Sequence, residues 1–192
     1  MKENFNLSDQ SIKIGIAPIN WSNDDMPELG GDTPIEQCLE EASLSGFTGI
    51  ELGPVGFMPE DPSILSEALD EFQQELIGGV VFRPFHDPDQ WDYVLDGAVR
   101  TCKSLMAHGA EHLVLIDSIS PRRAPTAGRS DEAEKMNRAE WTTFKDRIAT
   151  VAKIGTEEYG LLVGIHAHAA GFIDFEPELE RLLQEVDESH LK

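Results

Sequence analysis

The chain has 192 residues, of which 40% are hydrophobic and 27% are charged, so it is long enough to bury the core of one globular domain. Its 36 acidic and 15 basic residues give a formal net charge of −21, which repels phosphate backbones and excludes nucleic acid as an expected partner. The sequence has no apolar run of about eighteen residues and no signal-peptide core, so we expect no membrane partner and a cytoplasmic location.

The order of apolar and polar residues predicts five successive strand–helix units after a polar tail over residues 1–11. Each unit has a short apolar run, a polar loop, an amphipathic helix with a capping signal, and a glycine before the next run. The predicted strands cover residues 12–19, 48–52, 76–85, 112–116 and 161–165. A long loop, residues 118–137, separates the fourth strand from its helix.

Each predicted helix has a start signal and an apolar face. The signals are a capping box at Thr33-Pro34-Ile35-Glu36 with proline at the first helical position, Asp61-Pro62, Asp87-Pro88, and the pair Asn137 and Glu140; the fifth helix is predicted over residues 175–186. The predicted inward residues include Ile35, Leu39 and Ala42 in the first helix, Ile64, Leu65, Ala68, Leu69 and Phe72 in the second, and Leu179, Leu182, Leu183 and Val186 in the fifth. Cys38 and Cys102 are expected to be buried free thiols.

Five such units fit either a doubly wound sheet or part of a TIM barrel. Length favours the doubly wound sheet, because a TIM barrel has roughly 250 residues. Polar residues, however, follow five consecutive predicted strands: Asn20, Glu51, His86, Asp117 and His166. Because all strand ends of a barrel face one site, this distribution favours the barrel.

Several motifs resemble the inosose dehydratases, within the xylose-isomerase-like TIM-barrel family. They are Gly15 to Asp25 followed by Pro27-Glu28-Leu29-Gly30-Gly31, then Glu36-Gln37-Cys38-Leu39, Gly49-Ile50-Glu51-Leu52-Gly53 and His166-Ala167-His168. The resemblance implies an incomplete α/β TIM barrel, with residues 1–192 forming a single partial domain that lacks strands six to eight. Open sheet edges would make such a domain marginally stable or prone to association, so we expect a possible homo-oligomer.

His166 and His168 are the sharpest local signal for chemistry, because alternation along a strand directs both imidazoles to the same side. The resemblance implies a divalent metal, manganese or cobalt, near the end of this strand, with His166 at the matching ligand position. The other ligands would follow strands six to eight, so metal binding by this chain is expected to be weak. Alternatively, one histidine caps the following loop while the other contacts substrate.

Glu51 lies between two glycines at a strand end, where other groups can approach it closely. It is a candidate for binding sugar hydroxyls or for acid–base work, and a loop anchor is an equal alternative.

The loop residues Asn20, Trp21, Asn23, Asp24 and Asp25 combine amide, indole and carboxylate groups suited to a cyclic polyol or keto sugar, although adjacent acidic residues also form turns. His86 and Asp117 are weaker candidates, because single polar residues at strand ends often act as caps. For Arg122, Arg123 and Arg129 in the long loop, pairing with nearby carboxylates is favoured over a role in the site.

The predicted function is that of an inosose-dehydratase-like lyase, which by resemblance removes water from 2-keto-myo-inositol in inositol catabolism. Glu51, His166 and His168 are the predicted catalytic residues, while Asn20, Trp21, Asn23, Asp24, Asp25 and His86 are predicted to bind substrate. A sugar or inosose isomerase or epimerase on the same scaffold would use the same enolisation and remains an alternative. A catalytically inactive fragment or polyol-binding module is the other alternative.

Overall fold

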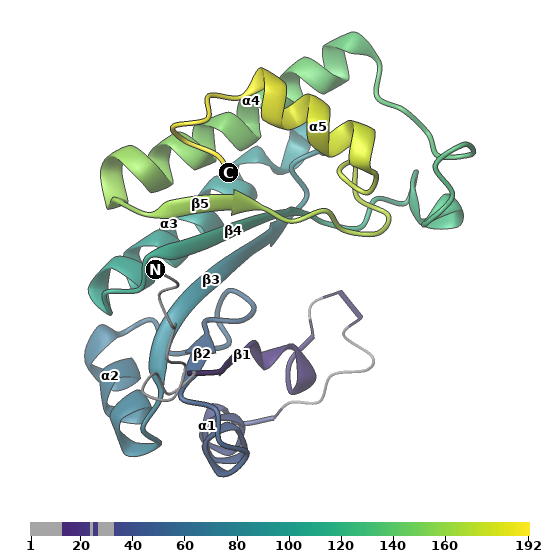
Figure 1. Cartoon of the computed structure of the whole chain (residues 1–192). Coiled ribbons are helices and arrows are strands. Elements are labelled where there is room, and N and C mark those ends of the chain that lie inside the picture. The colour runs from purple at the N-terminus through teal and green to yellow at the C-terminus, as the bar shows by residue number, and fades with distance from the viewer. Residues whose placement is uncertain (1–12, 24, 27–32) are drawn as a thin grey trace, which may run out of the picture.

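A computed structural model of the chain describes residues 13–23, 25–26 and 33–192. Its centre is a five-stranded, fully parallel sheet in the order β1-β2-β3-β4-β5 (Figure 1). The strands are β1 (Gly15–Ile16), β2 (Gly49–Glu51), β3 (Glu75–Arg83), β4 (His112–Asp117) and β5 (Leu162–Ile165). Neighbours in the sheet are neighbours in sequence, as in a barrel wall, whereas a doubly wound sheet reverses its strand order.

The helices follow the strands one by one and lie along the outer side of the curved sheet in Figure 1. They are α1 (Ile35–Leu44), α2 (Pro62–Glu71), α3 (Trp91–Ala107), α4 (Arg138–Lys153) and α5 (Glu176–Glu185). This arrangement confirms the five strand–helix units. Among the residues that the structure describes, no helix is both long and apolar enough to cross a membrane.

The first strand is much shorter than the predicted range of residues 12–19. Only Gly15 and Ile16 pair with β2, and a 3-10 turn occupies Pro18–Asn20. Proline has a fixed φ and no backbone N–H, so a strand cannot continue normally through Pro18. The turn directs the following loop across the carboxyl end of the sheet.

Helix starts agree with the prediction at three of the four signals. Asp61 accepts hydrogen bonds from the backbone of Ser63 and Ile64, Asp87 caps a 3-10 turn before α3, and Asn137 and Glu140 form a reciprocal capping box. The predicted capping box at Thr33 is wrong, because Pro34 is itself the N-cap of α1 and no side chain caps it. Pro34 therefore precedes the first helical residue.

Two predicted core residues are exposed. The exposed fraction is 54% for Ile64 and 39% for Leu183. Their helices bury narrower stripes, which contain Leu65 and Leu69 in α2 and Leu182 in α5. Apolar residues at the edge of a helical stripe reach the sheet only where the helix lies flat against it.

The main core lies between the sheet and its outer helices. Val81, Leu113 and Leu115 point from β3 and β4 into this layer, where they are fully buried with Leu105 and Ile148 of α3 and α4. Burying each such side chain stabilises the fold by about 1.5–3 kcal/mol. Because side chains alternate along a strand, the residues between them face the other, concave side of the sheet.

Both cysteines lie in this core as free thiols, as predicted. Burial raises the pKa of Cys38 to about 11 and that of Cys102 to about 12, so both are protonated and unreactive near neutral pH.

Candidate active site

A cavity of about 370 Å³ lies on the concave side of the sheet, at the carboxyl ends of its strands. Its apolar floor is formed by Val80, Val114 and Ile116 of β3 and β4, the side chains that alternate with the buried core residues. The polar groups that line it are those of Ser22, Asp25, Glu51, His166 and His168. A cavity of this size accommodates a small ligand, and an apolar floor with a few convergent polar groups is typical of such sites.

Glu51 is the last residue of β2 and is half-buried in the cavity. The register between β2 and β3 shifts at this residue: Ile50 pairs with Leu76, but Glu51 pairs with Gly78. Such bulges re-aim side chains and are frequent beside active sites. Burial raises the pKa of the Glu51 carboxyl above its ordinary value.

Gly53 lets the first loop approach Glu51 closely. It has a φ of +69°, and a Cβ at this position would lie 2.4 Å from Cγ of Pro18. A residue with a side chain would be strained by this conformation and would also collide with the loop that follows β1. The glycine thus positions Pro18 as one wall of the cavity.

His168 is held between two oxygen atoms. Its Nδ1 lies 2.9 Å from the carbonyl oxygen of Ala169, and its Nε2 lies 2.8 Å from Oδ2 of Asp25. A carbonyl oxygen can only accept a hydrogen bond, so Nδ1 is the donor to Ala169, and this orientation turns Nε2 toward the carboxyl of Asp25. The ring of Phe82 contacts the imidazole edge to face, with the centroids 5.1 Å apart.

His166 also lines the cavity, and the centroid of its ring lies 6.1 Å from that of the His168 ring. Its backbone N–H donates to the carbonyl of Leu115, which continues the pairing of β5 with β4. The imidazole is exposed, and within the described ranges it makes no hydrogen bond. Both histidines therefore line one cavity just beyond the end of β5; His168 is fixed by two partners, and His166 has no side-chain partner among the described residues.

The described part of the chain does not form a complete metal site. It contains no group of three or more histidine, cysteine, aspartate or glutamate side chains arranged to hold a metal ion. The Nε2 of His168 is occupied by Asp25, which leaves His166 as the open imidazole in the cavity. A catalytic metal usually needs three protein ligands, so the described side chains alone do not fit one.

Three of the residues of the first loop that were predicted to bind substrate, Asn20, Trp21 and Asn23, do not line the cavity. The Trp21 indole donates to Glu41 of α1 over 2.6 Å, and Asn20 is exposed on the 3-10 turn. Oδ1 of Asn23 accepts from the backbone N–H groups of Asp25 and Met26, a turn that presents the Asp25 carboxylate to His168. Asp24 lies outside the described residues.

His86, which was predicted to bind substrate, and Asp117 form a structural link beside the cavity, and neither of them lines it. Asp117 is 1% exposed, and its Oδ1 accepts from both the backbone N–H and Nδ1 of His86. Its Oδ2 accepts from the backbone N–H of Phe172, which lies in the loop after His168. Asp117 thus joins the end of β3 to the loop that carries His168.

The arginines of the 118–137 loop pair with carboxylates, as predicted. Arg123 is 1% exposed and makes two hydrogen bonds to Glu178 of α5, while Arg122 and Arg129 make exposed pairs. The three arginines therefore anchor the loop, and none of them lines the cavity.

Sequence reasoning missed several residues that shape the cavity. The apolar floor on β3 and β4 could have been found from alternation, because Val80, Val114 and Ile116 are out of phase with the residues directed to the helices. Ser22 and Pro54 give no such signal, since their positions depend on how two loops meet.

Curated proteins resemble the chain over nearly all of its length. The rhizopine catabolism protein MocC of Rhizobium meliloti is 32% identical over 178 residues, 93% of this chain and 54% of MocC. An inosose dehydratase of Klebsiella pneumoniae strain 342 is 31% identical over 185 residues, 95% of this chain and 60% of that protein. The chain thus spans between half and two thirds of the length of these relatives. No family model matches it.

Solved structures share the fold at low sequence identity. A xylose isomerase-like TIM-barrel protein from Mycobacterium smegmatis, in complex with magnesium, has a TM-score of 0.68 at 14% identity over 93% of this chain and 62% of its own. The probable 3-DHS dehydratase AsbF from Bacillus anthracis has a TM-score of 0.62 at 17% identity, covering 94% of this chain and 61% of AsbF. A D-allulose 3-epimerase from Methylomonas, in complex with D-allulose, has a TM-score of 0.62 at 13% identity, covering 92% of this chain and 59% of the epimerase.

Proposed function

Because the chain is a homologue of the inosose dehydratases and has the fold of part of a xylose isomerase-like TIM barrel, we propose that it works in a hydro-lyase that dehydrates 2-keto-myo-inositol. The observation that carries this proposal is one cavity that contains a half-buried carboxylate, Glu51, and two imidazoles above an apolar floor. Acid and base groups on a shared cavity are what a β-elimination requires.

The proposed reaction divides the proton transfers between Glu51 and the histidines. The ketone acidifies the neighbouring C–H bond, and the Glu51 carboxylate takes that proton as the electron pair moves toward the carbonyl. Collapse of the enolate expels the β-hydroxyl, which leaves as water with a proton from an imidazolium. The raised pKa of Glu51 suits a base, because a carboxylate with a higher pKa binds the abstracted proton more strongly.

The two histidines differ in the role their surroundings support. His166 is free to approach the leaving hydroxyl, so we assign the acid to it. His168 is fixed by Ala169 and Asp25, and this pair is suited to orient a substrate hydroxyl and to pass on the proton that it holds.

The first loop is proposed to bind the polyol. Asp25 lines the cavity directly. We propose that Asn20 and Asp24 also contact the substrate. Three further residues do not contact the substrate in this proposal but hold the walls of the site in place. Trp21 does so through Glu41, Asn23 through Asp25, and His86 through Asp117. The structurally similar D-allulose 3-epimerase was solved with bound D-allulose, which supports a small sugar-like ligand for this chain.

A divalent metal, manganese or cobalt, defines a metal-bound form of the site in this proposal; His166 is a ligand in that form, and the role of acid then passes to His168. The magnesium complex of the neighbouring TIM-barrel protein supports a divalent cation. We assign no reaction step to the metal, because the described residues supply too few ligands to place it.

A sugar or inosose epimerase is the second candidate, and the neighbouring D-allulose 3-epimerase favours it. It would use the same proton abstraction by Glu51 and return the proton to carbon, so that no C–O bond breaks. A polyol-binding module without turnover is the third.

Turnover of 2-keto-myo-inositol distinguishes these candidates. The protein is incubated with the substrate, with and without manganese or cobalt, and the products are separated by chromatography and identified by mass spectrometry. Loss of one water supports the dehydratase, an isomer of unchanged mass supports the epimerase, and saturable binding without product supports the binding module. Glu51→Gln should abolish turnover, whereas Glu67→Gln, at an exposed carboxylate of α2, should not.

Light scattering on the same sample tests the proposed association into a homo-oligomer.

A further inference from the structure

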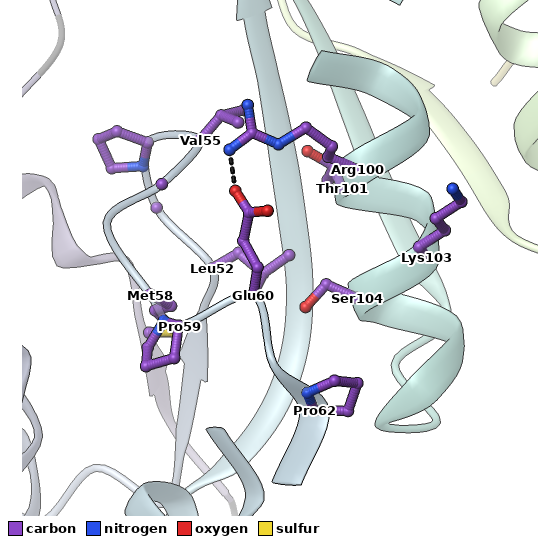
Figure 2. A pocket seen from close by; sticks show the side chains of 13 residues that line it. Leu52, Val55, Met58, Pro59, Glu60, Pro62, Arg100, Thr101, Lys103 and Ser104 are labelled. Carbon is purple, nitrogen blue, oxygen red and sulfur yellow. Dashed lines mark hydrogen bonds and ion pairs between the residues drawn. The ribbon is translucent and has the colours of Figure 1, made fainter. Parts of the chain in front are cut away.

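A second cavity, of about 330 Å³, lies on the outer side of the sheet, between α3 and the loop that joins β2 to α2. Its loop side is apolar and includes Leu52, Val55 and Met58. On its helix side, Arg100, Thr101 and Ser104 face the loop (Figure 2). An apolar wall opposite a few polar groups is the composition of a small-molecule site.

Arg100 carries a buried donor that is not used. Its Nε–H is buried and has no hydrogen-bond partner among the residues that the structure describes. A buried donor without an acceptor destabilises the fold, so an acceptor that reaches it is favoured. The Nε and Nη2 groups of a guanidinium lie side by side and match the two oxygens of a carboxylate.

The Nη2 of Arg100 pairs with Glu60 of the loop, and this pair crosses the cavity in Figure 2. The exposed fraction of the side chain is 40% for Arg100 and 61% for Glu60. Exposed ion pairs contribute little to stability, so another carboxylate can replace Glu60 at Arg100.

We propose that this outer cavity binds a small organic carboxylate. The carboxylate takes both Nε and Nη2 of Arg100 in place of Glu60, and its carbon chain lies on Leu52, Val55 and Met58. The hydroxyls of Thr101 and Ser104 are close enough to the same side of the cavity to bind polar substituents of the ligand.

Binding at this site acts on the active-site cavity, because the two cavities share a wall. Gly53 and Pro54 line both of them, directly after Glu51. Release of Glu60 from Arg100 frees the far end of the same loop. The ligand is therefore an effector that alters the position of Gly53 and the access to Glu51.

Nuclear magnetic resonance tests the site without requiring turnover. Titration of ¹⁵N-labelled protein with sodium butyrate should shift the Nε–H signal of Arg100 saturably, and the Gly53 amide should shift with the same dissociation constant. Arg100→Gln should weaken binding at least tenfold, as expected when a charged bidentate partner is lost. Glu60→Gln should tighten binding about two- to fivefold, because the competing ion pair is removed.

Two controls make the result decisive. Arg181→Gln removes another exposed arginine that pairs with a glutamate, Glu185, and it should leave butyrate binding unchanged. Butanol has a similar carbon chain without the charge and should bind at least tenfold more weakly. Equal binding of butanol, or a butyrate affinity that Glu60→Gln does not raise, would overturn the proposal. Because binding is measured directly, a failed dehydratase assay leaves this test unaffected.

Discussion

His168 and Asp25 are separated by 143 residues in the sequence, yet Nε2 of the histidine lies 2.8 Å from Oδ2 of the aspartate. The contact joins the loop after β1 to the loop after β5, at the two outer strands of the sheet. The aspartate fixes the ring orientation and takes part in holding its proton, the role that a carboxylate partner gives to a histidine in an acid–base site.

Asp25→Asn tests this pair. The amide retains the size of the side chain but removes the charge that faces Nε2, so we expect turnover to fall about a hundredfold, within the range of acid–base contributions. The ¹⁵N signals of the His168 ring should move in the same variant, and its melting temperature should change little. Asp87→Asn is the matched control, because asparagine caps a helix as well as aspartate does. An unchanged His168 spectrum in Asp25→Asn would contradict the assignment.

Arg123→Met should destabilise the protein strongly. The guanidinium is 1% exposed and bonds to Glu178 and to the carbonyl of Glu134, and its removal leaves the partly buried Glu178 without its partner. Breaking such a pair costs about 3–5 kcal/mol. Urea unfolding measures the change in free energy. Arg129→Met, in the same loop but at an exposed pair, should cost under about 1 kcal/mol; equal losses in both variants would refute the anchoring role of Arg123.

Stability should depend on pH through Glu51. Its pKa is raised by burial, so the folded state binds this proton more tightly than the unfolded state does. Stability therefore falls as pH rises from the ordinary pKa of glutamate through the folded pKa, and the deficit remains at neutral pH. Glu51→Gln should raise the free energy of unfolding at pH 7, with no gain below about pH 4.

Glu41 supplies the control of opposite sign. Hydrogen bonds from Trp21 and Gln37 lower its pKa, so its contribution to stability is present at neutral pH and is lost on acidification. Glu41→Gln should therefore lower stability at pH 7, and the difference should shrink in acid. The same sign of change in both variants would contradict the burial of Glu51.

Asp117→Asn should also reduce stability. The buried carboxylate accepts from three N–H groups, those of the His86 backbone, the His86 ring and the Phe172 backbone. An asparagine places its own NH₂ group against one of these donors, and the unsatisfied groups cost about 2–3 kcal/mol. Thermal unfolding measures the loss. Asp61→Asn, at an exposed helix cap, should leave the melting temperature nearly unchanged, because asparagine is an equivalent N-cap.

The order of the elements and most of the core follow from local patterns in the amino-acid sequence. Apolar periodicity and capping residues act over a few positions, so the starts of α2 and α4 and the burial of Trp141, Phe144 and Ile148 follow from local pattern. Strand alternation likewise predicted that His166 and His168 face one site, and both line the same cavity just beyond the end of β5. The length of β1 could not be derived in this way, because pairing with β2 ends where the turn at Pro18 begins.

The contacts between polar residues, in contrast, depend on the three-dimensional packing of the chain. Trp21 and Asp25 belong to one short loop, but the turn at Asn23 separates them, so that the indole reaches Glu41 and the carboxylate reaches His168. His86 and Asp117 follow different strands and bind each other beside the cavity. Such contacts depend on the relative placement of strands far apart in sequence, and this placement is fixed by packing of the whole sheet against its helices.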